Sequence, residues 1–255
     1  MTHPISNDLS GQVALVTGAT SGLGRRFARV LAEAGAAVAV AGRREDRLAE
    51  VVAELEGVGA SAFPLALDMT DAEAVKAAPG AVEAGLGGPV SILINNAGIP
   101  DAQHAHKMSL DLIDAVFDTN LRGPYILSCE VARRLIELKQ PGRMVNISSV
   151  GGFHYAGGGA ALYSVTKAGI ARMTEVLAVE WSRNHINVNC IAPGAFSSEM
   201  MDGMLSRVGD ITQGFPRKRL GQPEQLDSTL LYLVSPSSEC VTGTVIKVDD
   251  GQGPR

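Results

Sequence analysis

The chain has 255 residues, 45% of them hydrophobic and 19% charged, and its formal net charge is −5 at pH 7. This length and apolar content are enough for one sizeable core, so residues 1–255 are predicted to form a single domain. The acidic balance argues against nucleic acid and membrane surfaces as partners, because both are bound through basic patches. No run reaches the roughly 20 apolar residues of a membrane span, and the N-terminus lacks a signal core. A cytoplasmic protein is expected.

Three cysteines, Cys129, Cys190 and Cys240, are scattered along the chain in apolar surroundings. They form no CxxC pair and have no neighbouring histidine. An odd, scattered set of this kind predicts reduced thiols in the core of a cytosolic protein. Neither a disulfide nor a metal site is expected.

Short apolar runs alternate along the chain with segments of helical periodicity. The expected strands are 12–17, 38–41, 62–67, 92–94, 144–147, 186–191 and 244–248. The expected helices are 22–34, 45–55, one from residue 71, one or two within 110–138, and 163–183, 197–208 and 223–234. Pro79 must kink or shorten the helix from residue 71. Continuous apolar strands that each precede a helix indicate an α/β fold, with a parallel sheet covered on both faces.

A glycine-rich turn, T-G-A-T-S-G-L-G at residues 17–24, separates the first expected strand and helix. Gly18 permits a tight turn, Gly22 lets a pyrophosphate approach the backbone, and Gly24 allows close packing of helix on strand. An ordinary strand–helix turn is the alternative. Its place at the start of a βαβ unit favours dinucleotide binding.

A second motif joins Tyr163 and Lys167, which stand four residues apart on an expected helix and so share one face. A cation beside a phenol favours the phenolate, so the tyrosine pKa is expected to fall. The preceding strand stops at Ser148 and Ser149, before a glycine-rich loop. A serine hydroxyl there could hold a carbonyl oxygen while the tyrosine exchanges a proton with it. These side chains are suited to catalyse carbonyl–alcohol interconversion, provided that a hydride carrier binds nearby.

These motifs together resemble the short-chain dehydrogenase/reductase (SDR) family, from about residue 11 to residue 251. The matches are the turn at 17–24, Asp68, N-N-A-G at 95–98, Asn120, the serine before the loop, Y-x-x-x-K at Tyr163/Lys167, and Pro193-Gly194. The resemblance implies a single Rossmann-type doubly wound sheet of seven parallel strands in order 3-2-1-4-5-6-7, with helices on both faces. It also implies an NAD(P)-binding oxidoreductase.

The resemblance implies four catalytic residues. Tyr163 would be the acid/base, and Lys167 would lower its pKa and hold the nicotinamide-ribose hydroxyls. Asn120 would hold a water that connects Lys167 to solvent; a helix-kink asparagine is its alternative reading. Ser149 is preferred to Ser148 because S-V-x-G follows it, although it stands 14 residues before Tyr163 where the family usually has 13. Ser148 is then expected to be a buried structural hydroxyl.

The residues at the end of the second expected strand indicate which cofactor is preferred. Gly42 stands where NAD-preferring members carry an acidic residue, and Arg43 and Arg44 follow it. Guanidinium groups match phosphate geometry, so NADP(H) is expected to be preferred over NAD(H). The alternative is that both arginines only pair with Glu45 or Asp46. The predicted cofactor-binding set is Gly18, Thr20, Ser21, Gly22, Leu23, Gly24, Arg43, Arg44, Asp68, Met69, Asn96, Ala97, Gly98, Tyr163, Lys167, Pro193, Gly194, Phe196 and Ser198.

The substrate pocket is expected to lie among residues 98–101, 153–162 and 195–205. These segments supply Phe153, His154, Tyr155, Phe196, Met200, Met201 and Met204. A methionine-containing lid suits a hydrophobic or acyl substrate, although methionine on a helix is more often core filler. Arginines that dock an acyl carrier protein in look-alikes are replaced here by Gln140 and Asn184.

The expected function is therefore NADP(H)-dependent interconversion of a small-molecule carbonyl and a secondary alcohol. The alternatives are a 3-oxoacyl-(acyl-carrier-protein or CoA) reductase, an NAD-dependent polyol- or steroid-type dehydrogenase, and a non-catalytic dinucleotide-binding regulator.

The family's helix pairing implies a homotetramer, through residues 112–138 and 163–183. The apolar residues that favour this pairing are Val116, Leu121, Ile126, Leu127, Val131, Leu135, Ile170, Met173, Val176 and Leu177.

Overall fold

The computed structural model describes residues 6–155 and 157–253, and seven parallel strands form one sheet in order β3-β2-β1-β4-β5-β6-β7. The strands are β1 (Val13–Thr17), β2 (Ala37–Gly42), β3 (Ala62–Ala66), β4 (Ile92–Asn95), β5 (Gly142–Ile147), β6 (Ile186–Pro193) and β7 (Val245–Val248). Each overlaps a range expected from the sequence. The predicted doubly wound sheet and its strand order are confirmed.

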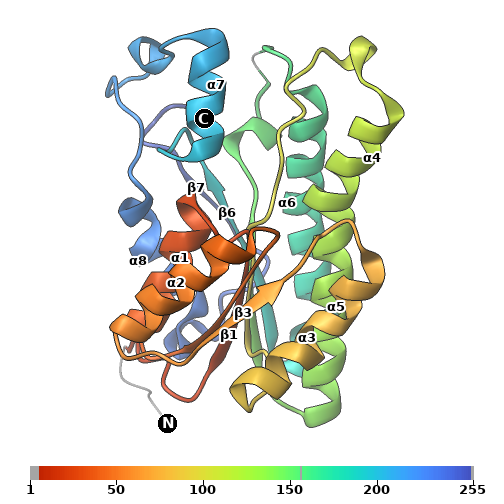
Figure 1. The fold of residues 1–255 in the computed structure, drawn as a ribbon, viewed down its shortest axis with the longest axis vertical. Helices are drawn as coiled ribbons and strands as arrows, with labels where there is room; N and C mark the ends of the chain where they lie inside the picture. Colours follow the sequence, from red (N-terminus) through yellow and green to blue (C-terminus); the bar gives the residue numbers. More distant parts are fainter. Residues whose placement is uncertain (1–5, 156, 254–255) are drawn as a thin grey trace.

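Helices cover both faces of the sheet, as Figure 1 shows. One face carries α1 (Gly22–Glu33), α2 (Glu45–Gly57) and α8 (Asp227–Val234); the other carries α3 (Ala72–Leu86), α5 (Gly123–Leu138) and α6 (Ala161–Trp181). Two further helices, α4 (Leu110–Phe117) and α7 (Glu199–Val208), follow the ends of β4 and β6. Because all strands run in parallel, their carboxyl ends meet at one edge, where α7 lies outside the two layers.

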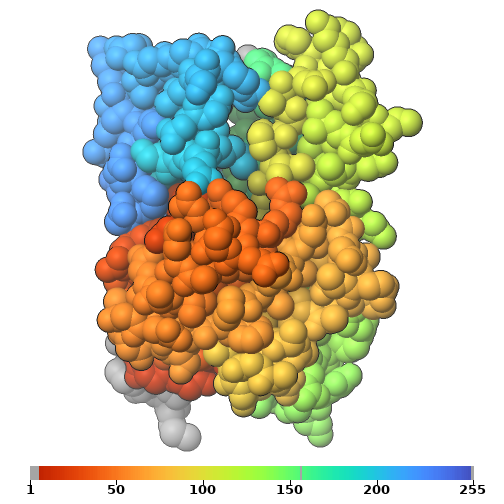
Figure 2. Space-filling model, in the orientation of Figure 1, coloured from red at the N-terminus to blue at the C-terminus, as the bar shows by residue number. Residues whose placement is uncertain are grey.

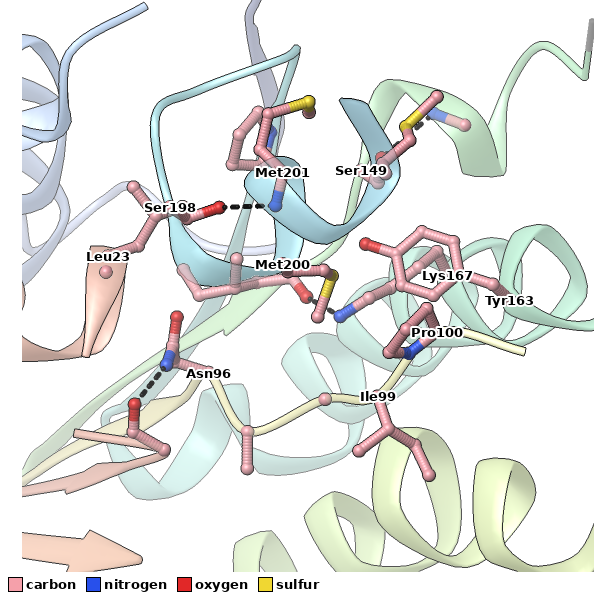
Figure 3. A pocket seen from close by; sticks show the side chains of 18 of the residues that line it. Leu23, Asn96, Ile99, Pro100, Ser149, Tyr163, Lys167, Ser198, Met200 and Met201 are labelled. Carbon is pink, nitrogen blue, oxygen red and sulfur yellow. Dashed lines mark hydrogen bonds between the residues drawn. The ribbon is translucent and has the colours of Figure 1, made fainter. Parts of the chain in front are cut away.

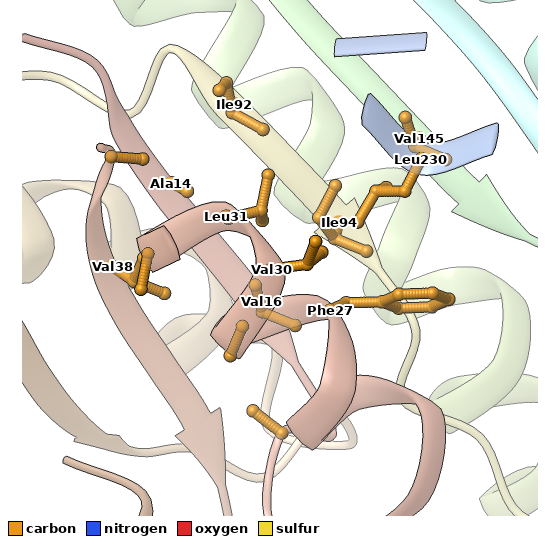
Figure 4. Packing of buried hydrophobic residues seen from close by; sticks show 14 of the residues in the cluster. Ala14, Val16, Phe27, Val30, Leu31, Val38, Ile92, Ile94, Val145 and Leu230 are labelled. Carbon is orange, nitrogen blue, oxygen red and sulfur yellow. The ribbon is translucent and has the colours of Figure 1, made fainter. Parts of the chain in front are cut away.

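Two apolar cores form, one on each face of the sheet. Figure 4 shows the first, where Phe27 and Leu31 of α1 pack on Val16 and Ile94 from the central strands. All four side chains are fully buried. Each buried side chain of this size contributes about 1.5–3 kcal/mol relative to its exposure. The central strands are therefore a rigid support for whatever lies at their carboxyl ends.

A buried polar chain ties strands and helices together just below that edge. The Asn95 side chain donates to Ser128 Oγ at 2.9 Å and to Asn146 Oδ1 at 2.8 Å, and Asn146 donates to Thr174 Oγ1 at 2.9 Å. Since these residues lie on β4, β5, α5 and α6, the chain fixes two strand ends relative to two helices. It leaves little freedom for the residues that follow β4 and β5.

The structure corrects two sequence expectations about the fold. Pro79 does not shorten α3, which continues for 15 residues through it, so of the two expected effects only a kink remains possible. The buried face of α3, including Val75 and Val82, packs in the second core on both sides of the proline, which offsets the lost hydrogen bond. Cys240 is exposed and is not a core thiol, whereas Cys190 is buried. Within the described residues, no helix combines the length and apolar character needed to cross a membrane.

Candidate active site

A cleft of about 740 Å³ opens at the carboxyl edge of the sheet. Figure 2 shows it as the hollow between the blue α7 region and the yellow segment that follows β4. Of the residues predicted for catalysis and cofactor binding, all except Gly24 and Asn120 line this one cleft. Residues from 18 to 198 in the sequence are thus brought to a single surface.

The glycine turn forms one end of the cleft. Gly18 and Gly22 have positive φ angles of 65° and 53°, which glycine adopts without strain. A Cβ on Gly24 would lie 2.2 Å from the Gly18 carbonyl oxygen, so Gly24 serves packing and not the cleft surface. The N-cap side chain of α1, Ser21, makes no capping hydrogen bond. The exposed amides of a helix N-terminus suit a pyrophosphate, so the turn fits a dinucleotide.

The two arginines after Gly42 face different partners from those expected. Arg43 is 65% exposed, with Nη1 3.9 Å from Asp68 Oδ2. Arg44 Nη2 donates to Thr20 Oγ1 at 2.8 Å and pairs with Glu199 Oε2 at 3.1 Å. Among the described residues neither arginine pairs with Glu45 or Asp46, so that alternative is wrong.

The Arg44–Glu199 pair spans the cleft from β2 to α7. The Arg44 guanidinium holds the pKa of the Glu199 carboxyl below its ordinary value.

Tyr163 and Lys167 lie at the other end of the cleft, in the first turns of α6 (Figure 3). Lys167 is 4% exposed, and its Nζ donates to the Ile147 carbonyl oxygen at 2.7 Å. Burial lowers the pKa of Lys167 from 10.5 to about 8. Its Nζ stands 5.5 Å from the centre of the Tyr163 ring.

The expected lowering of the Tyr163 pKa is wrong for this structure. Burial raises the pKa of the phenol, and this effect outweighs the influence of the neighbouring Ser149 side chain, which favours ionisation. Lys167 does not reverse the balance, because its ammonium is directed to the Ile147 carbonyl. The neutral phenol is the favoured form.

The two neighbouring serines have different surroundings. Ser149 lines the cleft together with Tyr163, and its hydroxyl accepts from Gly151 N at 3.1 Å. Ser148 is buried, and its hydroxyl donates to the Lys167 carbonyl oxygen at 2.7 Å. Of the two, Ser149 is the one whose side chain favours ionisation of the Tyr163 phenol.

Asn120 lies behind the cleft wall in a π-helical turn, Asp118–Arg122, between α4 and α5. Its Oδ1 accepts from Ile99 N at 2.8 Å, and its Nδ2 donates to Ile99 O at 2.9 Å. A Cβ on Gly98 would stand 3.5 Å from both Asn120 Oδ1 and Lys167 Nζ, so the three residues are close neighbours. Asn120 therefore holds the segment after β4, and the π turn agrees with the helix-kink reading.

Methionines of α7 form the lid side of the cleft. Met200, Met201 and Met204 line it, and Met200 and Met204 are partly exposed, so these two are not core filler (Figure 3). Phe153 does not line the cleft, contrary to expectation. Its ring packs instead under Lys247 Nζ, at 4.6 Å from the ring centre.

The contact between Asp101 and the tyrosine helix was not predicted, although residues 98–101 were expected to border the pocket. Asp101 is buried beside Tyr163, and its Oδ2 accepts from Leu162 N at 2.8 Å. The signal in the sequence is indirect: residues 157–161, G-G-G-A-A, offer no capping side chain at the start of the tyrosine helix. A cap had to come from elsewhere in the chain.

Comparison with known proteins agrees with this geometry. Residues 12–208 match the family model described as short chain dehydrogenase. The chain belongs to the short-chain dehydrogenase/reductase family. It is an NAD(P)-dependent SDR enzyme that acts on CH–OH groups.

Three SDR relatives differ in what they act on. The chain is 35% identical over 254 residues to gluconate 5-dehydrogenase of Gluconobacter oxydans, with 98% of each chain covered. The structure of actinorhodin polyketide ketoreductase with NADPH matches with a TM-score of 0.91 at 32% identity, covering 98% of this chain and 100% of that one. The 3-ketoacyl-(acyl-carrier-protein) reductase from Brucella melitensis, with NADH, matches with a TM-score of 0.87 at 28% identity, covering 97% and 100%.

Buried Lys167 makes the stability of this SDR protein depend on pH. The folded state disfavours the charged ammonium of Lys167. The resulting loss of stability is fully present below pH 8 and disappears above pH 10.5. As pH rises from 8 to 10.5, the unfolding free energy of the wild type should therefore increase relative to that of Lys167→Met, by on the order of 3 kcal/mol. Urea unfolding at several pH values measures it. Exposed Lys107→Met is the control and should follow the wild type; parallel curves for Lys167→Met would contradict the burial argument.

Proposed function

We propose that this SDR enzyme is an NADP(H)-dependent oxidoreductase that interconverts a small-molecule carbonyl and a secondary alcohol, with Tyr163 as acid/base. The observation that carries the proposal is the placement of Ser149, Tyr163 and Lys167 at one end of a cleft whose other end is a glycine turn. Two hydroxyl groups there converge from β5 and α6. They can both bind one substrate oxygen.

In the proposed mechanism the substrate carbonyl oxygen accepts hydrogen bonds from the Ser149 and Tyr163 hydroxyls. The bound dinucleotide supplies or accepts the hydride. During reduction Tyr163 donates its proton to the alkoxide, which suits a phenol that is kept neutral by burial. Lys167, close to Asn120 and Gly98, would contact the nicotinamide ribose and return a proton to Tyr163.

Preference for NADP(H) is supported by the end of β2. Gly42 presents no carboxylate to repel a 2′-phosphate, and Arg43 is free to reach one because its only ion pair among the described residues is a long one to Asp68. Arg44 lies on the same side but also holds Glu199. The relatives were solved with NADPH and with NADH, so they leave the preference open.

The substrate is proposed to be a small carbonyl compound or secondary alcohol with an apolar portion. The methionines of α7 provide the apolar wall. The relatives act on gluconate, a polyketide and a 3-ketoacyl group, so the substrate lies within a broad range of carbonyl compounds and alcohols.

A homotetramer is proposed from the outer faces of α4, α5 and α6, although not through the residues first expected. Of those residues Val176 alone is exposed; the others are buried or partly buried, most of them in the protein's own cores. Other apolar side chains are exposed in their place: Leu110 at 76%, Val165 at 57% and Val179 at 78%. Val165 and Val176 are about three turns of α6 apart, and Val179 follows Val176 at the i+3 position, so the three share one face.

The first test of the mechanism is Tyr163→Phe. The change removes the exchangeable proton at the reacting oxygen and keeps the ring, so turnover should fall at least about 10²-fold with cofactor affinity little changed. Steady-state assays at the nicotinamide absorbance, with a panel of ketones and alcohols, measure it. The control is Tyr232→Phe, an exposed tyrosine outside the cleft. Near-normal turnover of the Tyr163→Phe variant would exclude Tyr163 as the acid/base.

The second test concerns cofactor preference. Gly42→Asp adds a carboxylate that repels the 2′-phosphate, which should move the kcat/KM ratio towards NAD(H) by about 2–3 kcal/mol, roughly 30- to 150-fold. Any side chain at Gly42 meets Thr20 Cγ2, at 2.8 Å from its Cβ, so Gly42→Asn is the matched control for size. Arg43→Ala should weaken NADP(H) alone. A wild type that already prefers NAD(H) would contradict the proposal.

The third test concerns assembly. Val179→Asp places a charge in the proposed interface, where it cannot be desolvated cheaply, so the tetramer should dissociate. Light scattering at matched concentrations reports the mass, and Val58→Asp, at an exposed valine after α2, is the control. A monomeric wild type would count against the tetramer.

A further inference from the structure

The catalytic helix α6 begins without a cap of its own. Its N-cap residue, Ala160, has no side chain that could accept a hydrogen bond, and three glycines precede it. The first amides of a helix need acceptors. Here they are supplied from a segment 61 residues earlier in the chain, the loop that follows β4: Asp101 Oδ2 accepts from Leu162 N at 2.8 Å and from Tyr163 N at 3.2 Å.

The Asp101 carboxylate is buried, with 3% of the residue exposed, and no cation of the described residues lies within 4 Å of it. Its other oxygen, Oδ1, accepts from Ala102 N at 2.9 Å. The charge is therefore stabilised by three backbone amides and by the positive end of the α6 dipole. Because moving the buried carboxylate away from these amides would leave its charge unpaired, the carboxylate also fixes the positions of the amides.

The loop that carries Asp101 is itself held against both sides of the cleft. Ala102 has a left-handed φ of 52°, which is strained for alanine and persists only where the surroundings enforce it. Its carbonyl oxygen accepts from Arg207 Nη1, on the lid helix α7, at 3.3 Å. Gln103 packs close to Gly159 in the glycine-rich loop, where a Cβ on the glycine would lie 3.2 Å from the Gln103 carbonyl carbon. The lid, this loop and the start of α6 thus form one connected chain of contacts.

We propose that Asp101 is a positioning residue for Tyr163, which fixes the backbone of that tyrosine in the cleft so that its hydroxyl meets Ser149. The proposal rests on the acid/base role of Tyr163 proposed above. It goes further by assigning a part of the site to a carboxylate outside the Ser149–Tyr163–Lys167 group.

The carboxylate also acts on the proton of the phenol. Its negative charge adds to burial in raising the pKa of Tyr163. Among the described residues, the titratable and charged groups that line this part of the cleft are Lys167 on α6, Asp101 after β4, His154 and Tyr155 after β5, and Arg207 on α7. Removal of the Asp101 charge alone should therefore make the phenol ionise at lower pH.

Two variants separate the cap from the charge. Asp101→Asn keeps one acceptor oxygen but no charge, so kcat for alcohol oxidation should stay near that of the wild type while its rise with pH moves to lower pH. Asp101→Ala has neither the acceptor oxygen nor the charge. Its kcat should fall roughly tenfold, which is the factor that corresponds to the free energy lost with one helix cap. Asp111→Asn, at an exposed aspartate in the first turn of α4, is the matched control and should leave the pH profile in place.

Hydrogen exchange gives a readout that does not need substrate. The amides of Leu162 and Tyr163 should exchange faster in Asp101→Ala than in the wild type, with Asp101→Asn in between. A normal kcat in Asp101→Ala, an unmoved pH profile in Asp101→Asn, or unchanged amide exchange would each overturn the proposal. If Asp101→Ala does not fold, the pH profile of Asp101→Asn decides.

Failure of the underlying mechanism would look different. If Tyr163→Phe retains its turnover, the acid/base assignment fails, whereas the exchange of the two amides still reports whether Asp101 caps α6. If both the tyrosine variant and the amide exchange behave as expected but the pH profile does not move, only the positioning proposal fails.

Discussion

The site depends on one interaction, the hydrogen bond from the buried Lys167 ammonium to the Ile147 carbonyl oxygen at 2.7 Å. It joins α6 to the end of β5. A second bond runs the other way, from the Ser148 hydroxyl to the Lys167 carbonyl oxygen at 2.7 Å. Together they fix the depth and rotation of the helix against the strand. Tyr163, one turn earlier, is then carried to the place where Ser149 leaves the sheet.

Burial of the Lys167 ammonium, which this hydrogen bond requires, lowers the stability of the fold. A lysine whose pKa falls to about 8 pays for burial in the folded state, and Asp101 and Asn120 are also buried polar groups in the same region. None is left unpaired: amides hold Asp101, and the Ile99 backbone holds Asn120. The cores on the two faces of the sheet supply the free energy that tolerates this arrangement. Polar groups gather at the strand ends because the site needs them there.

Much of this arrangement could be predicted from the sequence, because it depends on patterns within short segments of the chain. The strands are continuous apolar runs, the glycine turn has a fixed spacing, and Tyr163 and Lys167 stand one helical turn apart. The choice of Ser149 over Ser148 followed from the residues after it. The expectation that Ser148 is a buried structural hydroxyl is confirmed, because its hydroxyl donates to the Lys167 carbonyl oxygen.

The rest depends on contacts between distant segments, which no local pattern contains. Asp101 caps a helix that begins 60 residues later. Arg44 finds its carboxylate on α7 and not in its own helix, and the direction of the Tyr163 pKa follows from burial rather than from the nearby lysine. Likewise, the apolar residues expected at an interface are mostly used by the protein's own cores.

The proposed function depends on hydride transfer between the nicotinamide and a carbinol carbon in this cleft. Reduction of a ketone that the wild type turns over, with NADPH deuterated at both C4 positions, tests it most directly. The expected product is an alcohol that carries one deuterium on the carbinol carbon, as mass spectrometry would show. An alcohol that carries only solvent hydrogen at that carbon would contradict it.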